Sequence, residues 1–107
     1  MESIKIKAFM KRTDRPDGYM TNVSNALKNL QNIVGGYIET ITIHGLGKDE
    51  DKAVVVICNE EGRLLGLPEN GSVMGIPIVG DYLIVGQDGE EFADVPLTIK
   101  EIKAIVE

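Results

Sequence analysis

The chain has 107 residues, 43% of them hydrophobic and 26% charged, and its formal net charge is −6. These values predict one globular domain spanning residues 1–107, which is large enough to form a core without disulfides, and they exclude an intrinsically disordered chain. No apolar run reaches the ~20 residues of a membrane-spanning helix, the N-terminus lacks a signal-peptide pattern, and the single cysteine, Cys58, cannot form an internal disulfide. We therefore expect a cytoplasmic protein that does not associate with membranes.

The charges are distributed unevenly along the chain. Residues 1–34 carry six basic and three acidic side chains, a net charge of +3, whereas residues 35–107 carry five basic and fourteen acidic ones, a net charge of −9. Because binding to the backbone of duplex nucleic acid depends on clustered Lys and Arg, the chain as a whole is predicted to bind duplex nucleic acid poorly. Only the N-terminal third is left as a candidate for a local basic patch.

The N-terminal third predicts a strand, a loop and a helix. Residues 4–10 alternate in polarity, which is typical of a half-buried strand. Lys11–Gly18 is charged and contains the turn sequence Pro-Asp-Gly, so an exposed loop is expected. Asn22 or Ser24 has a side-chain oxygen that suits a helix N-cap. The apolar residues that follow recur at helical spacing, at Ala26, Leu27, Leu30, Ile33 and Val34.

A two-glycine joint follows this helix. Gly35 suits the left-handed position that ends many helices, and Gly36 allows a tight turn. Tyr37–His44 is rich in β-branched residues and predicts a strand. The joint is therefore the point at which the chain reverses from helix to sheet, and the helix is expected to lie across that sheet.

The middle of the chain predicts strands joined by turns. Ala53–Cys58 is apolar at every position, which favours a central strand covered on both faces. Asn59–Gly62 and Pro68–Ser72 have turn compositions. Ile78–Val85 predicts a further strand, with a bulge or a close approach at Gly80.

The C-terminal residues predict a short strand and a second helix. Glu90–Ala93 is expected to add the strand, and Thr98 and Glu101 have the spacing of a capping box. The apolar stripe of the helix is formed by Ile99, Ile102, Ile105 and Val106.

The predicted fold is therefore α+β in the order β-α-β-β-β(-β)-α. It has a small, mostly antiparallel sheet of four to five strands, because the later strands are joined by tight turns. The two helices, each with a single apolar stripe, are expected to cover one face of that sheet.

The residues exclude more chemistry than they indicate. His44 is the single histidine and lies at a predicted strand end, while Cys58 closes the most apolar strand, which favours a buried and inert thiol. There is no Cys-x-x-Cys, His pair, Walker loop or dinucleotide-binding glycine pattern. We predict no catalytic residue, no metal and no cofactor.

One constellation suits the binding of an anion. Arg12 and Arg15 precede the predicted helix N-terminus, whose free N–H groups favour anions, and Arg is a bidentate donor to phosphate. Tyr19 lies between them and the helix and has a ring that suits stacking on a base. The alternative is an ordinary surface loop in which the two arginines pair with Asp14 and Asp17.

Four short motifs resemble those of a known family. They are Leu30–Gln31…Val34–Gly35–Gly36–Tyr37–Ile38–Glu39, Asn59–Glu60–Glu61–Gly62, Leu67–Pro68…Asn70 and Ile78–Val79–Gly80. Together they resemble a family of small proteins of unknown function from phages, plasmids and other mobile elements, mostly of Firmicutes, over about residues 22–92. The resemblance implies an accessory protein of a mobile element inside a bacterial host cell, and it supplies no catalytic residues.

Two binding functions and one enzymatic function follow from these observations. The first is an oligomeric, non-catalytic binder that sequesters a small anionic ligand, such as a signalling nucleotide, to counter host defence. Because a domain of this size has little room for a deep pocket, its site is expected between the subunits of a homo-oligomer. The candidate ligand-binding residues are Arg12, Arg15, Tyr19, Tyr37, Asn59, Arg63 and Asn70.

The alternative is an interaction module whose acidic C-terminal two-thirds binds and inhibits a host protein with a basic surface. An enzyme ranks last, because no acid–base or nucleophilic group stands out in the sequence.

Overall fold

The computed structural model describes residues 4–46 and 53–107, and this part of the chain contains eight strands and two helices. In chain order they are β1 (Lys5–Arg12), β2 (Arg15–Ser24), α1 (Leu27–Val34), β3 (Ile38–Ile43), β4 (Ala53–Asn59), β5 (Glu69–Val73), β6 (Ile76–Val79), β7 (Tyr82–Asp88), β8 (Glu91–Ala93) and α2 (Ile99–Ile105). The predicted α+β class and the two helices are confirmed. The predicted four to five strands are wrong, and so is the predicted order, because two hairpins were not recognised.

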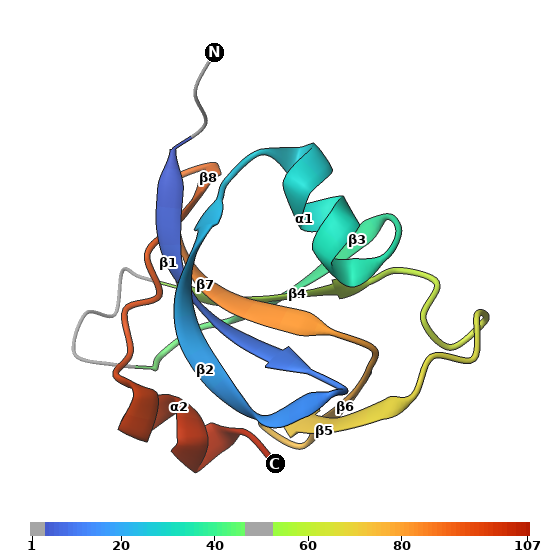
Figure 1. Cartoon of the computed structure of the whole chain (residues 1–107). Coiled ribbons are helices and arrows are strands. Elements are labelled where there is room, and N and C mark those ends of the chain that lie inside the picture. Colours follow the sequence, from blue (N-terminus) through green and yellow to red (C-terminus); the bar gives the residue numbers. More distant parts are fainter. Residues whose placement is uncertain (1–3, 47–52) are drawn as a thin grey trace.

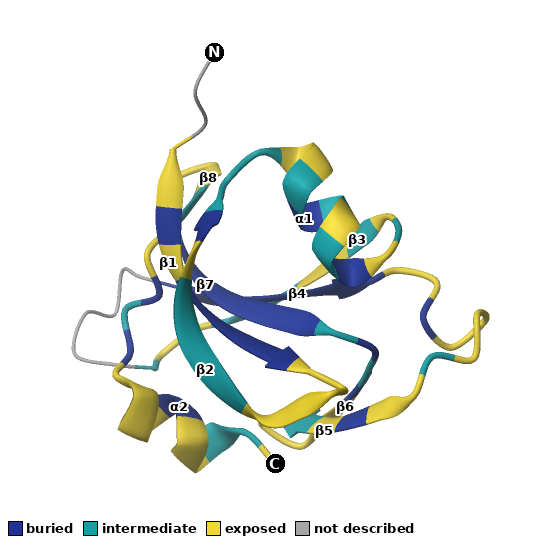
Figure 2. Cartoon of the chain, viewed as in Figure 1, coloured by how far each residue is buried: buried dark blue, intermediate teal, exposed yellow. Residues whose placement is uncertain are grey.

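The main sheet has the strand order β2-β1-β7-β4-β3, and β8 pairs with β7 beyond this path. Every pairing in it is antiparallel, as expected. The two inner strands β4 and β7 are buried along almost their whole length, which Figure 2 shows as dark blue ribbon. The prediction that Ala53–Cys58 is a central strand is confirmed, because the side chains on both of its faces are buried.

The first unrecognised hairpin is formed by β1 and β2. The predicted loop Lys11–Gly18 is instead a two-residue turn at Thr13 and Asp14, after which the chain returns along β1 as a ten-residue strand. Asn22 pairs with Lys7 inside this hairpin, so it caps no helix. Helix α1 begins later, at Leu27, and its N-cap residue Ala26 makes no side-chain capping bond.

The reason for this error is visible in the packing of the hairpin. Gly18, which was assigned to a turn, lies in β2 with a φ of 71°, and a Cβ at this position would lie 2.2 Å from the ring of Phe9. Gly18 thus lets β2 pass over a large buried aromatic side chain. The alternation of burial within β1 is also lost near Phe9, because Phe9, Met10 and Lys11 are all buried.

The two helices lie on opposite faces of the main sheet, as Figure 1 shows. On one face, Leu30 and Val34 of α1 pack with Leu83 and Val85 of β7. On the other face, Ile102 of α2 packs in a second core.

That second core also contains Tyr82 and Ile84, whose positions alternate along β7 with Leu83 and Val85. The expectation that both helices cover one face is therefore wrong. An inner strand with apolar side chains on both faces requires a cover on each of them.

The second unrecognised hairpin is formed by β5 and β6, which make a separate two-stranded sheet. Its turn is Met74–Gly75, and both residues have a positive φ, 50° and 78°, as the tight turns of two-residue hairpins require. The predicted turn at 68–72 and the single strand at 78–85 are corrected accordingly. The latter is divided at Gly80, whose φ is 76° and where a Cβ would lie 2.7 Å from Leu67, so the predicted close approach at Gly80 is confirmed.

The two-glycine joint is confirmed. Gly35 has a φ of 80°, and the N–H groups of Gly35 and Gly36 both donate to the carbonyl of Gln31. The predicted capping box of the C-terminal helix is also confirmed, between Thr98 and Glu101. Neither helix in the described residues has the length and apolarity to cross a membrane.

Candidate functional site: a groove beside the edge strand

A groove of about 280 Å³ lies between the main sheet and the β5–β6 hairpin. One side is formed by β3 and β4, and the other by β6 and the turn that connects β4 to β5. The residues that line it are Glu39, Ile41, Cys58, Asn59, Glu60, Gly62, Arg63, Leu64, Ile76, Pro77, Ile78 and Val79.

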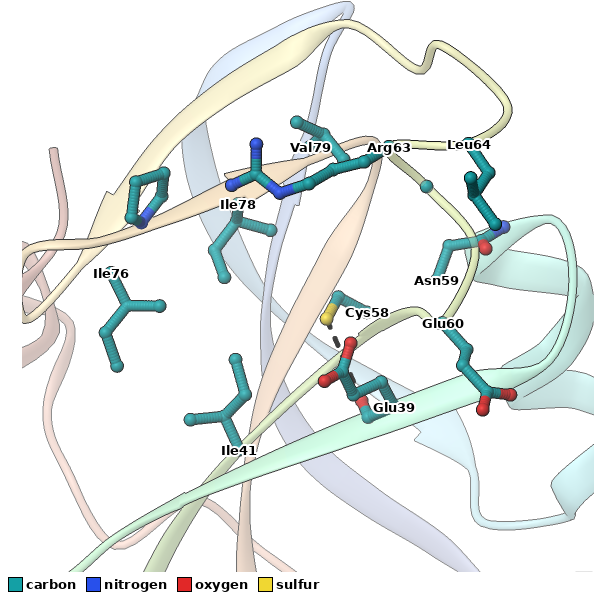
Figure 3. Close-up of a pocket in the computed structure, with 12 residues that line it drawn as sticks. Glu39, Ile41, Cys58, Asn59, Glu60, Arg63, Leu64, Ile76, Ile78 and Val79 are labelled. Carbon is teal, nitrogen blue, oxygen red and sulfur yellow. Dashed lines mark hydrogen bonds between the residues drawn. The ribbon is translucent and has the colours of Figure 1, made fainter.

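The groove combines apolar side chains with unpaired charges. Ile41 on the β3 side faces Ile76 and Ile78 on the β6 side (Figure 3). Arg63 lies on the β6 side, whereas Glu39 and Glu60 lie on the side of β3 and β4. All three charged residues are exposed. The one ion pair found among the described residues joins Arg12 to Asp14, so the charges at the groove are free to bind another molecule.

The turn after β4 closes one end of the groove. The side-chain oxygen of Asn59 accepts a hydrogen bond of 2.8 Å from the N–H of Glu61, which starts the turn. Gly62 then approaches β6 so closely that a Cβ would lie 2.7 Å from the side chain of Val79. Leu64, carried by this turn, is 86% exposed although it is apolar.

A more open hollow of about 540 Å³ lies on the other side of this turn, at the C-terminal end of α1. Tyr37 and Leu65 line it together with Gly35 and Gly36, and Tyr37 is 66% exposed and Leu65 59% exposed. The amide nitrogen of Asn59 donates to the carbonyl of Val34 at 3.0 Å between the two hollows. The turn therefore presents exposed apolar side chains to both hollows, which is unusual for a surface facing only water.

Cys58 lies at the bottom of the groove but is a poor nucleophile. It is 6% exposed, and its thiol donates to the carbonyl of Glu39 at 3.8 Å. Burial, and secondly the charge of Glu39, raises the pKa of the Cys58 thiol to about 11, so the reactive thiolate is scarce at neutral pH. His44 lies on the surface beyond β3. The described residues contain no group of three or more His, Cys, Asp and Glu side chains that could hold a metal ion.

The predicted anion-binding residues Arg12, Arg15 and Tyr19 come together on the β1–β2 hairpin. Arg12 and Arg15 are cross-strand partners, and the guanidinium of Arg15 lies 4.0 Å from the centre of the Tyr19 ring. Arg12 pairs with Asp14 at 2.9 Å. None of the three lines either hollow, and the helix N-terminus that was expected beside them lies at the far end of β2.

The other four predicted residues divide into two kinds. Tyr37 and Arg63 are exposed and line the open hollow and the groove. Asn59 and Asn70 are buried, and their amides bond to the protein itself.

Of the twelve residues that line the groove, the candidate ligand-binding residues predicted from the sequence include only Asn59 and Arg63, and Glu39, Leu64 and Ile76 are among those that were missed. For Leu64 the available signal was the apolar pair Leu64–Leu65 between two turn sequences, because adjacent exposed apolar side chains are typical of an interaction surface.

Comparison with known proteins identifies the family and no closer relative. The model of a family described as a domain of unknown function (DUF3846) matches residues 6–107, so the chain belongs to this family. No curated protein and no solved structure matches the chain significantly.

Proposed function

We propose that this member of the DUF3846 family is a non-catalytic accessory protein of a phage or other mobile element that binds and inhibits a host protein through the groove beside β3. The observation that carries the proposal is the exposure of Leu64, Leu65 and Tyr37 around two adjoining hollows. Exposed apolar patches with a polar rim are typical of protein interfaces, in which Tyr is enriched.

The charge of the region favours a basic partner. Residues 35–107, which supply every residue of the groove, carry a net charge of −9. The mobile-element origin implied by the motifs makes a host enzyme that binds nucleic acid a natural target, because such enzymes have basic surfaces.

The test is a pull-down from host lysate with three forms of the chain. Leu64→Lys changes the most exposed apolar side chain of the groove, and Ile4→Lys makes the same type of change at a site that is 71% exposed and outside the groove. We expect one host protein to be retained by the wild type and by Ile4→Lys, lost with Leu64→Lys, and eluted by salt. Equal retention by all three forms would contradict the proposal.

A small anionic ligand, such as a signalling nucleotide, is the second candidate function. Two arginines and a tyrosine on one hairpin support it, because an exposed guanidinium is a strong phosphate donor. A thermal-shift panel of cyclic nucleotides tests it: we expect a rise in the melting temperature that Arg15→Ala removes. The absence of a shift with every nucleotide of the panel, in a folded sample, would argue against it.

The second candidate involves a homo-oligomer. Arg12, Arg15 and Tyr19 line neither hollow of their own chain, so a nucleotide enclosed by them would need a second copy to complete its site. In such an assembly the basic hairpin of one copy lies against the acidic region of another, which the +3 and −9 halves favour. Light scattering at low and high salt measures the number of subunits. A monomer under both conditions would limit any nucleotide to the hairpin alone.

A further inference from the structure

The outer edge of β3 carries backbone groups that have no partner in the described chain. The strand is last in the sheet order, and it pairs with β4 alone. The N–H of Glu60 donates to the carbonyl of Tyr37, which identifies Tyr37 and Glu60 as a hydrogen-bonded pair. Since bonded and non-bonded pairs alternate along an antiparallel ladder, the N–H and C=O groups of Ile38, Thr40 and Thr42 point away from β4.

Among the described residues, this edge lacks several of the features that protect an edge strand. Proteins prevent edge pairing with proline, with charged side chains (lysine above all), with bulges, with short strands or with a covering loop. The one charged side chain of β3, Glu39, lines the groove. The β3 sequence Ile-Glu-Thr-Ile-Thr-Ile contains no proline and no lysine, and its six-residue register with β4 has no shift. An exposed, regular strand of β-branched residues is suited to pairing with another chain.

The groove lies on one face of this edge. Glu39 and Ile41 of β3 line the groove, and Ile43, the next residue on the same face, packs at the margin of the same core. A strand added beside β3 would place every second side chain next to these three residues, at the distance at which cross-strand pairs interact.

We propose that β3 binds an extended segment of the partner protein by strand addition. On the side facing the groove, the segment carries one Lys or Arg opposite Glu39 and apolar residues opposite Ile41 and Ile43. The backbone bonds supply affinity and the alternate side chains supply specificity, as in other strand-addition complexes. This inference rests on the proposed interaction function and specifies how the partner is recognised.

The charges favour a basic partner over a second copy of this chain. Pairing two β3 edges would bring two copies of Glu39, the one charged side chain of β3, into the same sheet, and Glu39 has no ion-pair partner among the described residues. A basic side chain in the added strand relieves this repulsion, whereas a second β3 increases it.

The test starts from displayed random 12-residue peptides selected on the folded full chain. We expect the enriched peptides to share a basic residue and two apolar residues at alternate positions. The affinity of the best peptide is then measured by fluorescence anisotropy for the wild type, Thr40→Pro and Thr40→Val. Proline removes the outward N–H of Thr40 without removing a bond to β4, so we expect at least a tenfold loss with Thr40→Pro and less than a twofold change with Thr40→Val.

A backbone scan of the peptide keeps the test decisive if Thr40→Pro does not fold. Methyl groups are placed on its amide nitrogens one at a time. Strand addition predicts that every second methyl group abolishes binding and that those between are tolerated. A peptide that tolerates every methyl group but is lost with Leu64→Lys would overturn strand addition and leave the proposed function standing.

Two further outcomes would also overturn the inference. One is the enrichment of no peptide, or of acidic ones. The other is a dimer of the chain that Thr40→Pro dissociates, which would assign the edge to a second copy.

Discussion

The two edges of the main sheet are built differently. At one edge, β2 contains Pro16, its register with β1 shifts near the turn, and Gly18 lets it curve over Phe9. At the other edge, β3 is regular and free of proline. Since unprotected edges are a liability that proteins normally remove, this difference supports the proposal that β3 binds a partner.

One buried asparagine lies near each edge. Asn70 donates to the carbonyls of Lys11 and Gly80 and accepts from the Lys11 ammonium at 2.9 Å, which fixes the end of β1. Asn59 connects the end of α1 to the turn beside β3. The four predictions below test this difference between the edges, from the largest expected effect to the smallest.

Asn70→Ala should lower the free energy of unfolding by about 3 kcal/mol, roughly a hundredfold in the folding equilibrium, because it removes three hydrogen bonds, one of them to a buried charge. The Lys11 ammonium would keep only the Asn70 carbonyl, at 2.8 Å, as a bonded acceptor in the described chain. Burial already lowers the pKa of Lys11. Urea unfolding measures the change, with Asn32→Ala on the exposed surface of α1 as the control. A loss no larger than that of the control would show that Asn70 does not fix this edge.

Cys58 reports on the floor of the groove at the β3 edge. Because burial raises its pKa from 9.0 to about 11, alkylation of the folded chain at pH 8 should be about a hundredfold slower than in urea. The rate should rise with pH until it levels near pH 11. Equal rates in the folded and unfolded chain would mean that the thiol is not covered.

Asn59→Ala should cost about 2 kcal/mol, roughly thirtyfold in the folding equilibrium, since it removes two hydrogen bonds rather than three. The effect should be local to the α1–β3 joint, because both partners of Asn59, Val34 and Glu61, lie beside it. Urea unfolding gives the magnitude. A cost above that of Asn70→Ala would show that the number of lost hydrogen bonds does not set the order of the two losses.

Tyr82 lies on β7 between the edges and should control stability at alkaline pH. It is fully buried, and burial raises its pKa well above the ordinary value of 10.0. The unfolded chain loses the Tyr82 proton first as the pH rises, so this contribution is complete below about pH 10 and decreases above it.

Wild-type stability should therefore fall more steeply above about pH 10 than that of Tyr82→Phe, by about 1.4 kcal/mol per pH unit. At pH 7 the two should agree within about 1 kcal/mol, because no described protein group bonds the Tyr82 hydroxyl. Thermal or urea unfolding across this pH range measures both values. Parallel pH profiles of the wild type and Tyr82→Phe would show that Tyr82 does not control stability at alkaline pH.

Local sequence patterns predicted the parts of the fold that depend on interactions between residues close in the chain. The all-apolar segment 53–58, the Gly35–Gly36 joint and the Thr98–Glu101 capping box are all confirmed. The errors occur where contacts between residues distant in the chain determine the secondary structure. Lys11–Gly18 has the composition of a loop, yet it forms the turn end of the β1–β2 hairpin, in which β2 covers Phe9. Met74–Gly75 forms a tight turn although Met seldom adopts a positive φ.

The candidate site was less predictable for the same reason. Asn59 and Asn70 have the right chemistry for a ligand, but their bonding partners within the fold are 25 and 59 residues away in the chain. The groove depends on β6 lying opposite β3, and no local pattern in the sequence places these two strands together.

The most direct test of an open β3 edge is the amide hydrogen exchange of this strand, measured by NMR on the free chain. We predict an alternating pattern: the N–H groups of Ile38, Thr40 and Thr42 exchange rapidly, and those of Glu39, Ile41 and Ile43 are protected by their bonds to β4. Uniform protection along β3 would mean that its outer edge is already paired, and it would contradict the account.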